Sequence, residues 1–358
     1  MEPYVFDDVL TGSTVTCAYP GLDASAAKGA SAPAACPSLF FPGCSFVNYG
    51  LPLVKATYDL LKDAGRVDGM SLLCCGKILG FEPDGPAVRA AFERQLCAHV
   101  ADAGVKRIVA ACPNCVAALR AALSRDERTA DVQVVVLPQE LAAMGYRVDA
   151  KVVRRLVAAE ASVDGADVAV CVHDSCPDRS TGEFADGVRA LLPEGMVVEA
   201  AHVRNRSFCC GSLLRAAGKF EAGDKQARRH GEEAEEVHAA AIVTACVSCA
   251  FQLATKQDAV PVFHYLELLF DWRVDWAHAS QYMKLRFLFD DVPDAEASGR
   301  AFVGLEGADD GCKGVPAAAR SQGSAAAAAG APVDADDGCG KDGGAPARPG
   351  KDEADGRG

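Results

Sequence analysis

The sequence lacks several features that mark common classes of protein. No apolar run approaches the ~20 residues of a membrane-spanning helix, so we expect no membrane insertion. The first ten residues hold no basic stretch followed by an apolar one, so no secretory signal is visible and we expect a cytoplasmic protein. Lys and Arg number 36 against 49 Asp and Glu, a formal net charge of −13. This balance argues against nucleic acid as a partner, because phosphate contacts need clustered positive charge.

Two kinds of cofactor motif are also missing. No G-x-G-x-x-G follows a predicted strand, and no other flavin or nicotinamide motif is evident, so we expect neither flavin nor NAD in this chain. No C-x-x-C-x-x-C-x-x-x-C-P run is present, so the chain has no ferredoxin-type relay of its own. If the chain is redox-active, its electrons must therefore arrive through another polypeptide.

Cysteine, in contrast, is abundant, with 16 in 358 residues. Many cysteines without an export signal favour metal or redox chemistry over a disulfide framework. A disulfide scaffold is also unnecessary, because a chain of this length with 50% hydrophobic residues can build its own core.

Most of these cysteines recur in two similar halves. Each half contains a single Cys, then Cys-Cys-Gly, then an apolar run that ends in C-x-x-C. The counterparts lie 132 to 135 residues apart: Cys44 and Cys176, Cys74 and Cys209, Cys112 and Cys246. Landmarks in such close register indicate a duplicated domain.

Short β-branched runs alternate with helical patterns in both halves. Buried strands are predicted at residues 107–110, 132–136, 168–172, 241–244 and 260–262, and longer helices at 86–103 and 221–240. Alternating strands and helices favour parallel sheets with helical cover. The predicted fold class is therefore α/β, with two Rossmann-like domains.

The predicted domains divide the chain into four parts. The two duplicated domains cover residues 38–160 and 161–292, and a weakly structured extension covers residues 1–37. From residue 293 to 358 the sequence is rich in Ala, Gly and Asp and nearly free of aromatic residues. Such a composition buries too little apolar surface to offset chain entropy, so a disordered acidic tail is predicted.

The placement of the C-x-x-C pairs suits metal binding. Each pair follows a predicted strand and opens a predicted helix, at residues 116–122 or 250–253. Its thiolates would lie at the carboxyl end of a strand and at a helix N-terminus, where free N–H groups stabilise negative charge. Gly76 and Gly211 would let the backbone approach the sulfur atoms closely.

The spacing of the cysteines alone does not decide between zinc and iron–sulfur clusters. Zinc needs four ligands and would leave one of the five cysteines of each half unused. Iron–sulfur clusters are held by thiolates and are redox-active, and five thiolates per half favour them. Zinc remains an alternative, and so do disulfides or free thiols.

The cysteine pattern resembles a known family. It is C-x(29)-C-C-G-x(35)-C-x-x-C in the first half and C-x(32)-C-C-G-x(34)-C-x-x-C in the second. This is similar to the tandem cysteine-rich CCG domain found in heterodisulfide reductase and in related iron–sulfur proteins. The resemblance implies two [4Fe-4S] clusters of a non-cubane type, each held by five cysteines: Cys44, Cys74, Cys75, Cys112 and Cys115, and Cys176, Cys209, Cys210, Cys246 and Cys249.

The resemblance also implies an activity and partners. It implies an oxygen-sensitive oxidoreductase subunit of anaerobic metabolism that reduces a small disulfide substrate to thiols. We expect a ferredoxin-like [4Fe-4S] subunit to donate the electrons, and a flavoprotein subunit is a further candidate partner upstream of that donor. The alternative is an electron-transfer subunit of a lactate, glycolate or glycerol-3-phosphate dehydrogenase complex without its own substrate. A third candidate is a zinc-stabilised interaction protein.

Several residues outside the repeated pattern are individual candidates. His173 is a weak catalytic candidate, which could donate a proton to a leaving thiolate or a hydrogen bond to a cluster sulfur. The alternative is that the neighbouring Asp174 and Ser175 only shape the turn that presents Cys176. Glu267 and its counterpart in the first half, Glu140, are each expected in the first turn of a helix, where a negative charge is favourable. Four further cysteines are interpreted as thiols without metal ligation: Cys17, Cys36, Cys97 and Cys171. Cys312 and Cys339 end two copies of Ala-Asp-Asp-Gly-Cys in the predicted tail, which we interpret as repetition within a linker-like segment.

Overall fold

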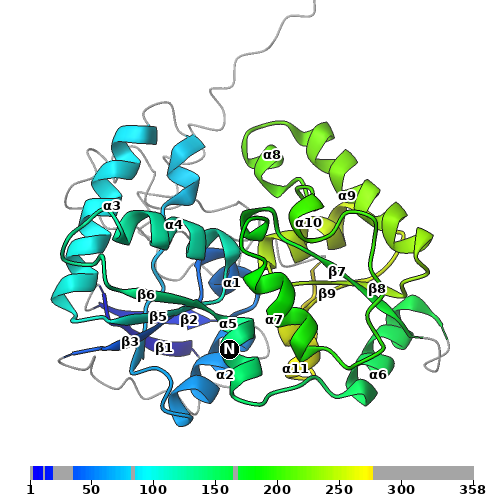
Figure 1. Cartoon of the computed structure of the whole chain (residues 1–358), viewed down its shortest axis with the longest axis horizontal. Helices are drawn as coiled ribbons and strands as arrows, with labels where there is room; N and C mark the ends of the chain where they lie inside the picture. The colour runs from blue at the N-terminus through cyan, green and yellow to red at the C-terminus, as the bar shows by residue number, and fades with distance from the viewer. Residues whose placement is uncertain (1–2, 11–12, 19–34, 82–84, 164–167, 277–358) are drawn as a thin grey trace, which may run out of the picture. The chain divides into compact units, whose positions relative to one another are not determined.

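The structure is a computed structural model, and it describes residues 3–10, 13–18, 35–81, 85–163 and 168–276 (Figure 1). The predicted disordered tail, residues 293–358, lies outside the described residues, together with Cys312 and Cys339. Among the described helices, none combines the length and the apolarity needed to cross a bilayer.

The first half is built on a sheet with the strand order β2-β1-β4-β3-β5-β6. Strands β4, β3, β5 and β6 are parallel to their neighbours. The central strands β3 and β5 are almost wholly buried, which explains why their sequences are continuous apolar runs. The strands are β1 (Pro3–Asp8), β2 (Ser13–Ala18), β3 (Ser38–Phe41), β4 (Gly69–Met70), β5 (Arg107–Ala110) and β6 (Gln133–Val136).

Strands β1 and β2 differ from the expected weakly structured N-terminal extension. They pair antiparallel, and β1 joins the parallel sheet through Asp8 and Met70 of β4. The buried Asp8 carboxylate accepts hydrogen bonds from the Leu72 N–H at 2.8 Å and the Ser71 hydroxyl at 3.0 Å. The β-branched and aromatic residues of both strands suit this pairing, but their signal is easily missed in a segment that is otherwise rich in Ala, Ser and Gly.

Helices cover both faces of this sheet, as Figure 1 shows for α2 on one side and α3 and α4 on the other. Helix α3 starts one residue before the predicted range 86–103 and buries Val88, Phe92, Leu96 and Val100. Gly104, with φ of +67°, follows its end. The helices of this half are α1 (Cys44–Tyr49), α2 (Leu51–Asp63), α3 (Gly85–Asp102), α4 (Pro113–Leu123), α5 (Leu137–Ala143) and α6 (Ala150–Ala161).

The second half repeats this design with fewer strands. Its sheet has the order β7-β8-β9, all parallel, and a single bridge between Val170 and Val197 takes the place that β4 has in the first half. The strands are β7 (Val170–His173), β8 (Ala241–Thr244) and β9 (Val262–His264), and the helices are α7 (Glu183–Leu191), α8 (Ser212–Ala216), α9 (Phe220–Glu236), α10 (Val247–Lys256) and α11 (Tyr265–Leu269).

The α/β class with two repeated domains and parallel sheets is therefore confirmed. Strands β5 and β8 match their predicted ranges, whereas β7 and β9 end one and two residues later than predicted. Helix α9 ends at Glu236, four residues before the predicted end. His238 there has φ of +54°, a left-handed conformation that no helix can continue through.

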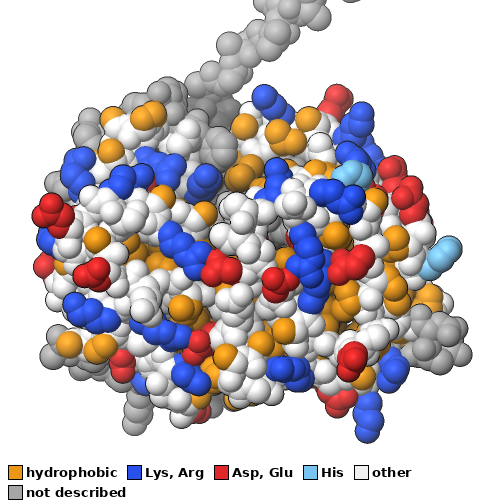
Figure 2. Space-filling model, in the orientation of Figure 1, with side chains coloured by type: hydrophobic (Ala, Val, Ile, Leu, Met, Phe, Trp, Pro, Cys, Tyr) orange, Lys and Arg blue, Asp and Glu red, His pale blue; other side chains and the backbone are white. Residues whose placement is uncertain are grey.

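The two halves contact each other along α1 and α10 and along α5 and α7. Tyr49 of α1 stacks on Phe251 of α10 with ring centroids 4.9 Å apart. Gly187 of α7 lies so close to α5 that an added Cβ would be 2.9 Å from the Gln139 nitrogen. On the face shown in Figure 2, Lys and Arg alternate with Asp and Glu over both halves, so no basic stripe is visible there.

Candidate metal centres

The cysteines of the first half meet where the strands of its sheet end. Cys44 is the first residue of α1, directly after β3, and Cys74 and Cys75 lie in the loop that follows β4. Cys112 is the N-cap of α4, directly after β5, and Cys115 lies in the first turn of that helix. The carboxyl ends of parallel strands therefore bring the five thiols to one edge of the sheet, as the sequence predicts.

These five thiols are connected by contacts between sulfur atoms. The Cys74 thiol donates to the Cys44 sulfur at 3.7 Å. Hydrogen bonds from the thiols of Cys115 and Cys74 lower the pKa of Cys75, and a bond from Cys115 lowers the pKa of Cys112. The five side chains thus form one connected set, which we call the first cysteine set.

The second cysteine set has the same arrangement. Cys176 follows β7, Cys209 and Cys210 lie in the loop before α8, and Cys246 and Cys249 occupy the start of α10. A hydrogen bond from Cys176 is the largest of the effects that lower the pKa of Cys209, to about 2. Cys210 contacts both Cys209 and Cys249, and Cys249 contacts Cys246.

One contact joins the two sets. The side chains of Cys112 and Cys246, the first cysteines of the two C-x-x-C pairs, lie close enough to shift each other's pKa, lowering that of Cys112 and raising that of Cys246. Beside them the hydroxyl groups of Ser45 and Ser248 lie 2.7 Å apart. All ten cysteines therefore belong to one continuous network that crosses the junction between the halves.

Backbone N–H groups are directed at the sulfur atoms in both sets. The Gly76 N–H lies 3.4 Å from the Cys74 sulfur, and the Gly211 N–H lies 3.3 Å from the Cys209 sulfur. Both glycines have positive φ, +73° and +99°, as the sequence predicts for this turn. Such donors stabilise thiolate and sulfide and tune the potential of a bound cluster.

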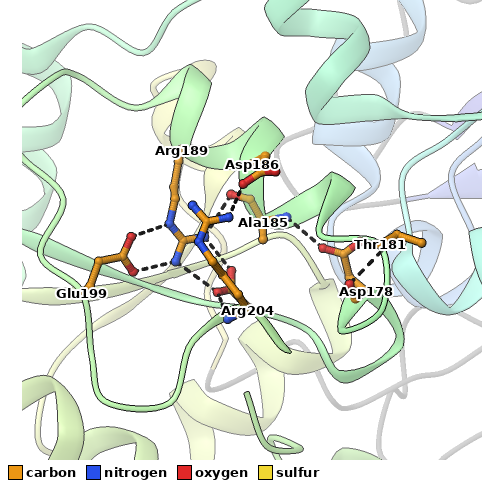
Figure 3. A network of polar contacts seen from close by, with 8 residues as sticks. Asp178, Thr181, Ala185, Asp186, Arg189, Glu199 and Arg204 are labelled. Atoms are coloured by element: carbon orange, nitrogen blue, oxygen red, sulfur yellow. Dashed lines mark hydrogen bonds and ion pairs between the residues drawn. The ribbon is translucent and has the colours of Figure 1, made fainter. Parts of the chain in front are cut away.

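A network of ion pairs fixes the turn that carries Cys176 (Figure 3). The buried Asp174 carboxylate accepts hydrogen bonds from Arg189 at 2.7 and 3.0 Å and from the Arg204 N–H at 2.7 Å. Asp178 accepts the Ala185 N–H at 2.9 Å. The interpretation of Asp174 as a residue that shapes this turn is therefore supported.

His173 is the last residue of β7, and it points toward the second cysteine set. Its ring nitrogen, the Cys210 sulfur and the Cys249 sulfur all lie within 4.8 Å of one another. The side chain is buried, and neither ring nitrogen has a hydrogen-bond partner. Burial lowers the pKa of His173 to about 4, although Asp174 and Cys209 oppose this shift.

The three remaining cysteines with described side chains belong to neither set. Cys36, Cys97 and Cys171 are buried, and burial raises the pKa of each thiol. The side chain of Cys17 lies outside the described residues. These findings agree with the interpretation of the three buried cysteines as core thiols.

The predicted first-turn positions of Glu267 and Glu140 are correct. Glu267 is the third residue of α11, and its carboxylate accepts the His264 N–H at 2.6 Å while the His264 ring accepts the Leu266 N–H. Glu140 lies in the first turn of α5 and pairs with Arg107 at 2.5 Å. Glu140 thus belongs to α5, which follows β6, and Glu267 to α11, which follows β9. An acidic residue in the first turn stabilises such a helix.

The donor atoms fit a thiolate-bound metal group. Thirteen cysteines have described side chains, and all of them are free thiols, including the ten of the two sets. Six of those ten are at most 6% exposed. The largest effects on their pKa values come from other thiols and from burial, and no lysine or arginine side chain is among them. Buried thiols of this kind become thiolates when they bind a metal, which compensates the charge.

Sequence reasoning missed the surroundings of His173. Its ring contacts His230 of α9 edge-on, with centroids 4.3 Å apart, and His230 stacks on Phe208 at 3.8 Å. His202 beside them is paired with the buried Glu233 at 2.6 Å. These residues are scattered along the second half of the chain. The signal that could have found them is that the counterpart of His173 in the first half, Phe41, is apolar.

Comparison with known families agrees with this geometry. The family model for CCG, the cysteine-rich domain, matches residues 38–120 and 170–254. Over these two segments the chain is similar to the CCG family. The two matches lie inside the predicted domains 38–160 and 161–292, and each covers all five cysteines of one set.

CCG domains are associated with iron–sulfur oxidoreductase subunits, and the cysteine sets fit iron–sulfur binding. No curated protein matches the chain. Among solved structures, glutamate racemase isoform RacE1 from Bacillus anthracis is similar with a TM-score of 0.31 and 10% identity, over 75% of this chain and 84% of that chain.

Proposed function

We propose that the chain is an iron–sulfur oxidoreductase subunit that takes electrons from a partner protein and reduces a small disulfide. The ten cysteines of the two sets would hold two [4Fe-4S] clusters, five thiolates to each. Such clusters supply one-electron transfer when bound. The observation that carries the proposal is the continuous network of ten thiols, joined through Cys112 and Cys246.

Two adjoining sites suit the stoichiometry of disulfide reduction. The reaction breaks one S–S bond and consumes two electrons and two protons to give two thiols. Two sites that each exchange one electron match the electron count, and solvent supplies the protons. Cys44, Cys112, Cys176 and Cys209 are only partly buried, which leaves a route by which a small sulfur compound could reach each set.

The partner in this proposal is a ferredoxin-like [4Fe-4S] subunit. It follows from the sequence, which holds neither a ferredoxin cysteine run nor a nicotinamide motif. The purified chain alone is therefore expected not to oxidise NADH or NADPH. Direct turnover with either nucleotide would contradict the need for a partner.

Anaerobically purified protein tests the proposal in two steps. Iron and acid-labile sulfide are measured first, and their absence in a zinc-containing chain would rule out the redox function. Reduced viologen is then mixed with the protein and 2-hydroxyethyl disulfide. Oxidation of two viologen molecules per disulfide, with two thiols formed, is the expected result.

Electron relay without a substrate is the second candidate, and two observations favour it. The two cysteine sets are in direct contact, and a cavity of about 940 Å³ bounded by Glu160, Gln257 and Trp276 is lined by none of the ten cysteines. Under this alternative the reduced centres are reoxidised by an artificial acceptor but not by 2-hydroxyethyl disulfide, and no viologen is consumed catalytically.

A further inference from the structure

The second cysteine set has a potential nitrogen donor for which the first set has no counterpart. His173 ends β7 just as Phe41 ends β3, and the two residues have the same spacing to Cys176 and Cys44. Both side chains are buried. The duplicated fold therefore places an imidazole beside one set and a phenyl ring beside the other.

The ring of His173 is not satisfied within the protein. It is 5% exposed, and neither Nδ1 nor Nε2 has a hydrogen-bond partner. A buried polar group without a hydrogen-bond partner lowers the stability of the fold. An imidazole in this position therefore indicates that its nitrogen atoms have a partner that is not part of the chain. Phe41 demonstrates that this fold accepts an apolar ring at the same point.

The position of the ring is suited to a metal. Its nitrogen lies within 4.8 Å of the sulfur atoms of Cys210 and Cys249, which also lie within 4.8 Å of each other. With metal–nitrogen and metal–sulfur bonds of about 2.0 and 2.3 Å in tetrahedral geometry, two ligand atoms of one metal lie ~3.5–3.8 Å apart. Approaches of at most about 1.3 Å between these side-chain atoms therefore suffice for all three to bind one metal atom.

A small cavity with several polar residues in its wall lies beside His173. Its volume is about 10 Å³, its polar lining is His173, His202, His230 and Glu233, and one oxygen of the buried Glu233 has no hydrogen-bond partner. This volume is about that needed for one water molecule. Histidine ligands usually donate their second N–H to a carboxylate or a water, which fixes the orientation of the ring.

We propose that His173 binds the metal group of the second cysteine set through a ring nitrogen, next to Cys210 and Cys249. The assignment rests on the proposed function, since it concerns one of the two clusters. Ligand identity and the charge around a cluster set its potential. The second centre, with an imidazole next to its five thiolates, should therefore differ in potential from the first.

Isotope labelling of the full chain tests the bond directly. Protein containing [15N]histidine and unlabelled protein are purified anaerobically, assayed for iron and sulfide, reduced and compared by pulsed EPR. The expected result is a nitrogen coupling of the size of a metal ligand that changes with the isotope. The wild-type comparison needs no variant, so it is independent of whether any substitution folds.

Two variants locate the nitrogen. His173→Phe, which copies Phe41, is expected to remove the coupling and change the potential of one centre while the other is unchanged. His230→Leu, which replaces the neighbouring buried imidazole, is the matched control and is expected to retain the coupling. A coupling that persists in His173→Phe would overturn the assignment.

The outcomes separate this assignment from the proposed function. Protein with iron and sulfide but without an isotope-sensitive coupling of ligand size overturns the role of His173 alone. Protein without iron and sulfide overturns the proposed function, and the assignment is then rejected with it.

Discussion

The two halves of the molecule have the same arrangement of cysteines but different surroundings. In the first half, β3 ends in the buried, apolar Phe41, and Phe92 of α3 lies against Gly76, next to Cys75. Around the second set, β7 ends in His173 and α9 contributes His230, which are buried and polar. The potential of a metal centre depends on hydrogen bonds, burial and neighbouring ligands as well as on its thiolates. Duplication has therefore preserved the sulfur positions while the environments diverged, and the two centres should behave differently.

The residues directly before the single cysteines Cys44 and Cys176 differ as well. Gly43 in the first half approaches Cys115 so closely that an added Cβ would lie 2.8 Å from its sulfur. Ser175 is its counterpart in the second half, and its hydroxyl lies 3.9 Å from the Cys249 sulfur. The first set is thus enclosed more tightly by backbone, whereas the second has room for a side chain and a further polar contact.

The largest expected effect comes from removing one thiolate from either set. Cys75→Ser and Cys210→Ser each delete a buried cysteine that contacts two others of its set. Each variant should lose about half of the iron and sulfide per chain, because serine oxygen is a poor ligand for these thiolate-held clusters. Chemical analysis of anaerobically purified protein measures this loss.

Cys97→Ser is the matched control for these two variants. Its thiol is buried but belongs to neither set. It should retain the wild-type iron content, although its stability can fall. Unchanged iron in both Cys75→Ser and Cys210→Ser would show that the two sets do not hold the metal.

A smaller effect distinguishes the two loops. Gly43→Ala adds a Cβ that meets the Cys115 sulfur, at a residue whose φ of +87° already disfavours alanine by about 1–3 kcal/mol. The variant should lose iron from the first set only, whereas Ser175→Ala should retain both centres. EPR spectra of the two variants, compared with the spectra of Cys75→Ser and Cys210→Ser, identify the centre that is lost. Equal losses in the two loop variants would contradict the difference in enclosure.

The sequence predicted the elements of the fold that depend on local pattern. Apolar runs located β5 and β8, and the two C-x-x-C pairs located the starts of α4 and α10, because buried parallel strands and helix starts carry strong local signals. The repeated cysteine spacing also predicted which five thiols converge in each half, since they all follow strands of one parallel sheet.

What could not be predicted depends on contacts between distant segments. The meeting of His173 with His230 requires β7 and α9 to pack together, and the contact between Cys112 and Cys246 requires the two halves to dock. Neither follows from spacing along the chain. The pairing of β1 with β4 likewise depends on the buried Asp8 and its partners more than 60 residues away.

The first-turn glutamates of α11 and α5 are expected to contribute differently to the stability of the fold. Glu267 is fully buried and accepts hydrogen bonds from Arg273 and from the N–H groups of His264 and Val274. Glu267→Ala leaves these donors unpaired and should lower the free energy of unfolding by about 3 kcal/mol. Glu140→Ala removes an ion pair with the partly exposed Arg107 and should cost about 1 kcal/mol. Denaturant titration of both variants measures the difference, and similar costs would contradict it.

The smallest expected effect concerns the junction of the halves. The Ser45 and Ser248 hydroxyl groups form one hydrogen bond of 2.7 Å beside the two cysteine sets. Each single alanine variant should lower the free energy of unfolding by about 1 kcal/mol, the usual net contribution of such a bond. Because both variants remove the same bond, the double variant should cost little more than either single one.

A double-mutant cycle in denaturant measures this energetic coupling, with Ser124→Ala as control because its exposed hydroxyl bonds only within its own helix end. The EPR spectrum of the reduced protein should also show magnetic coupling, since two paramagnetic centres on either side of this bond are close enough to interact. Additive costs for Ser45→Ala and Ser248→Ala would mean that the two hydroxyl groups do not meet in solution. The halves would then be docked differently, and the electron path through Cys112 and Cys246 would have to be abandoned while each cysteine set could still hold its own metal.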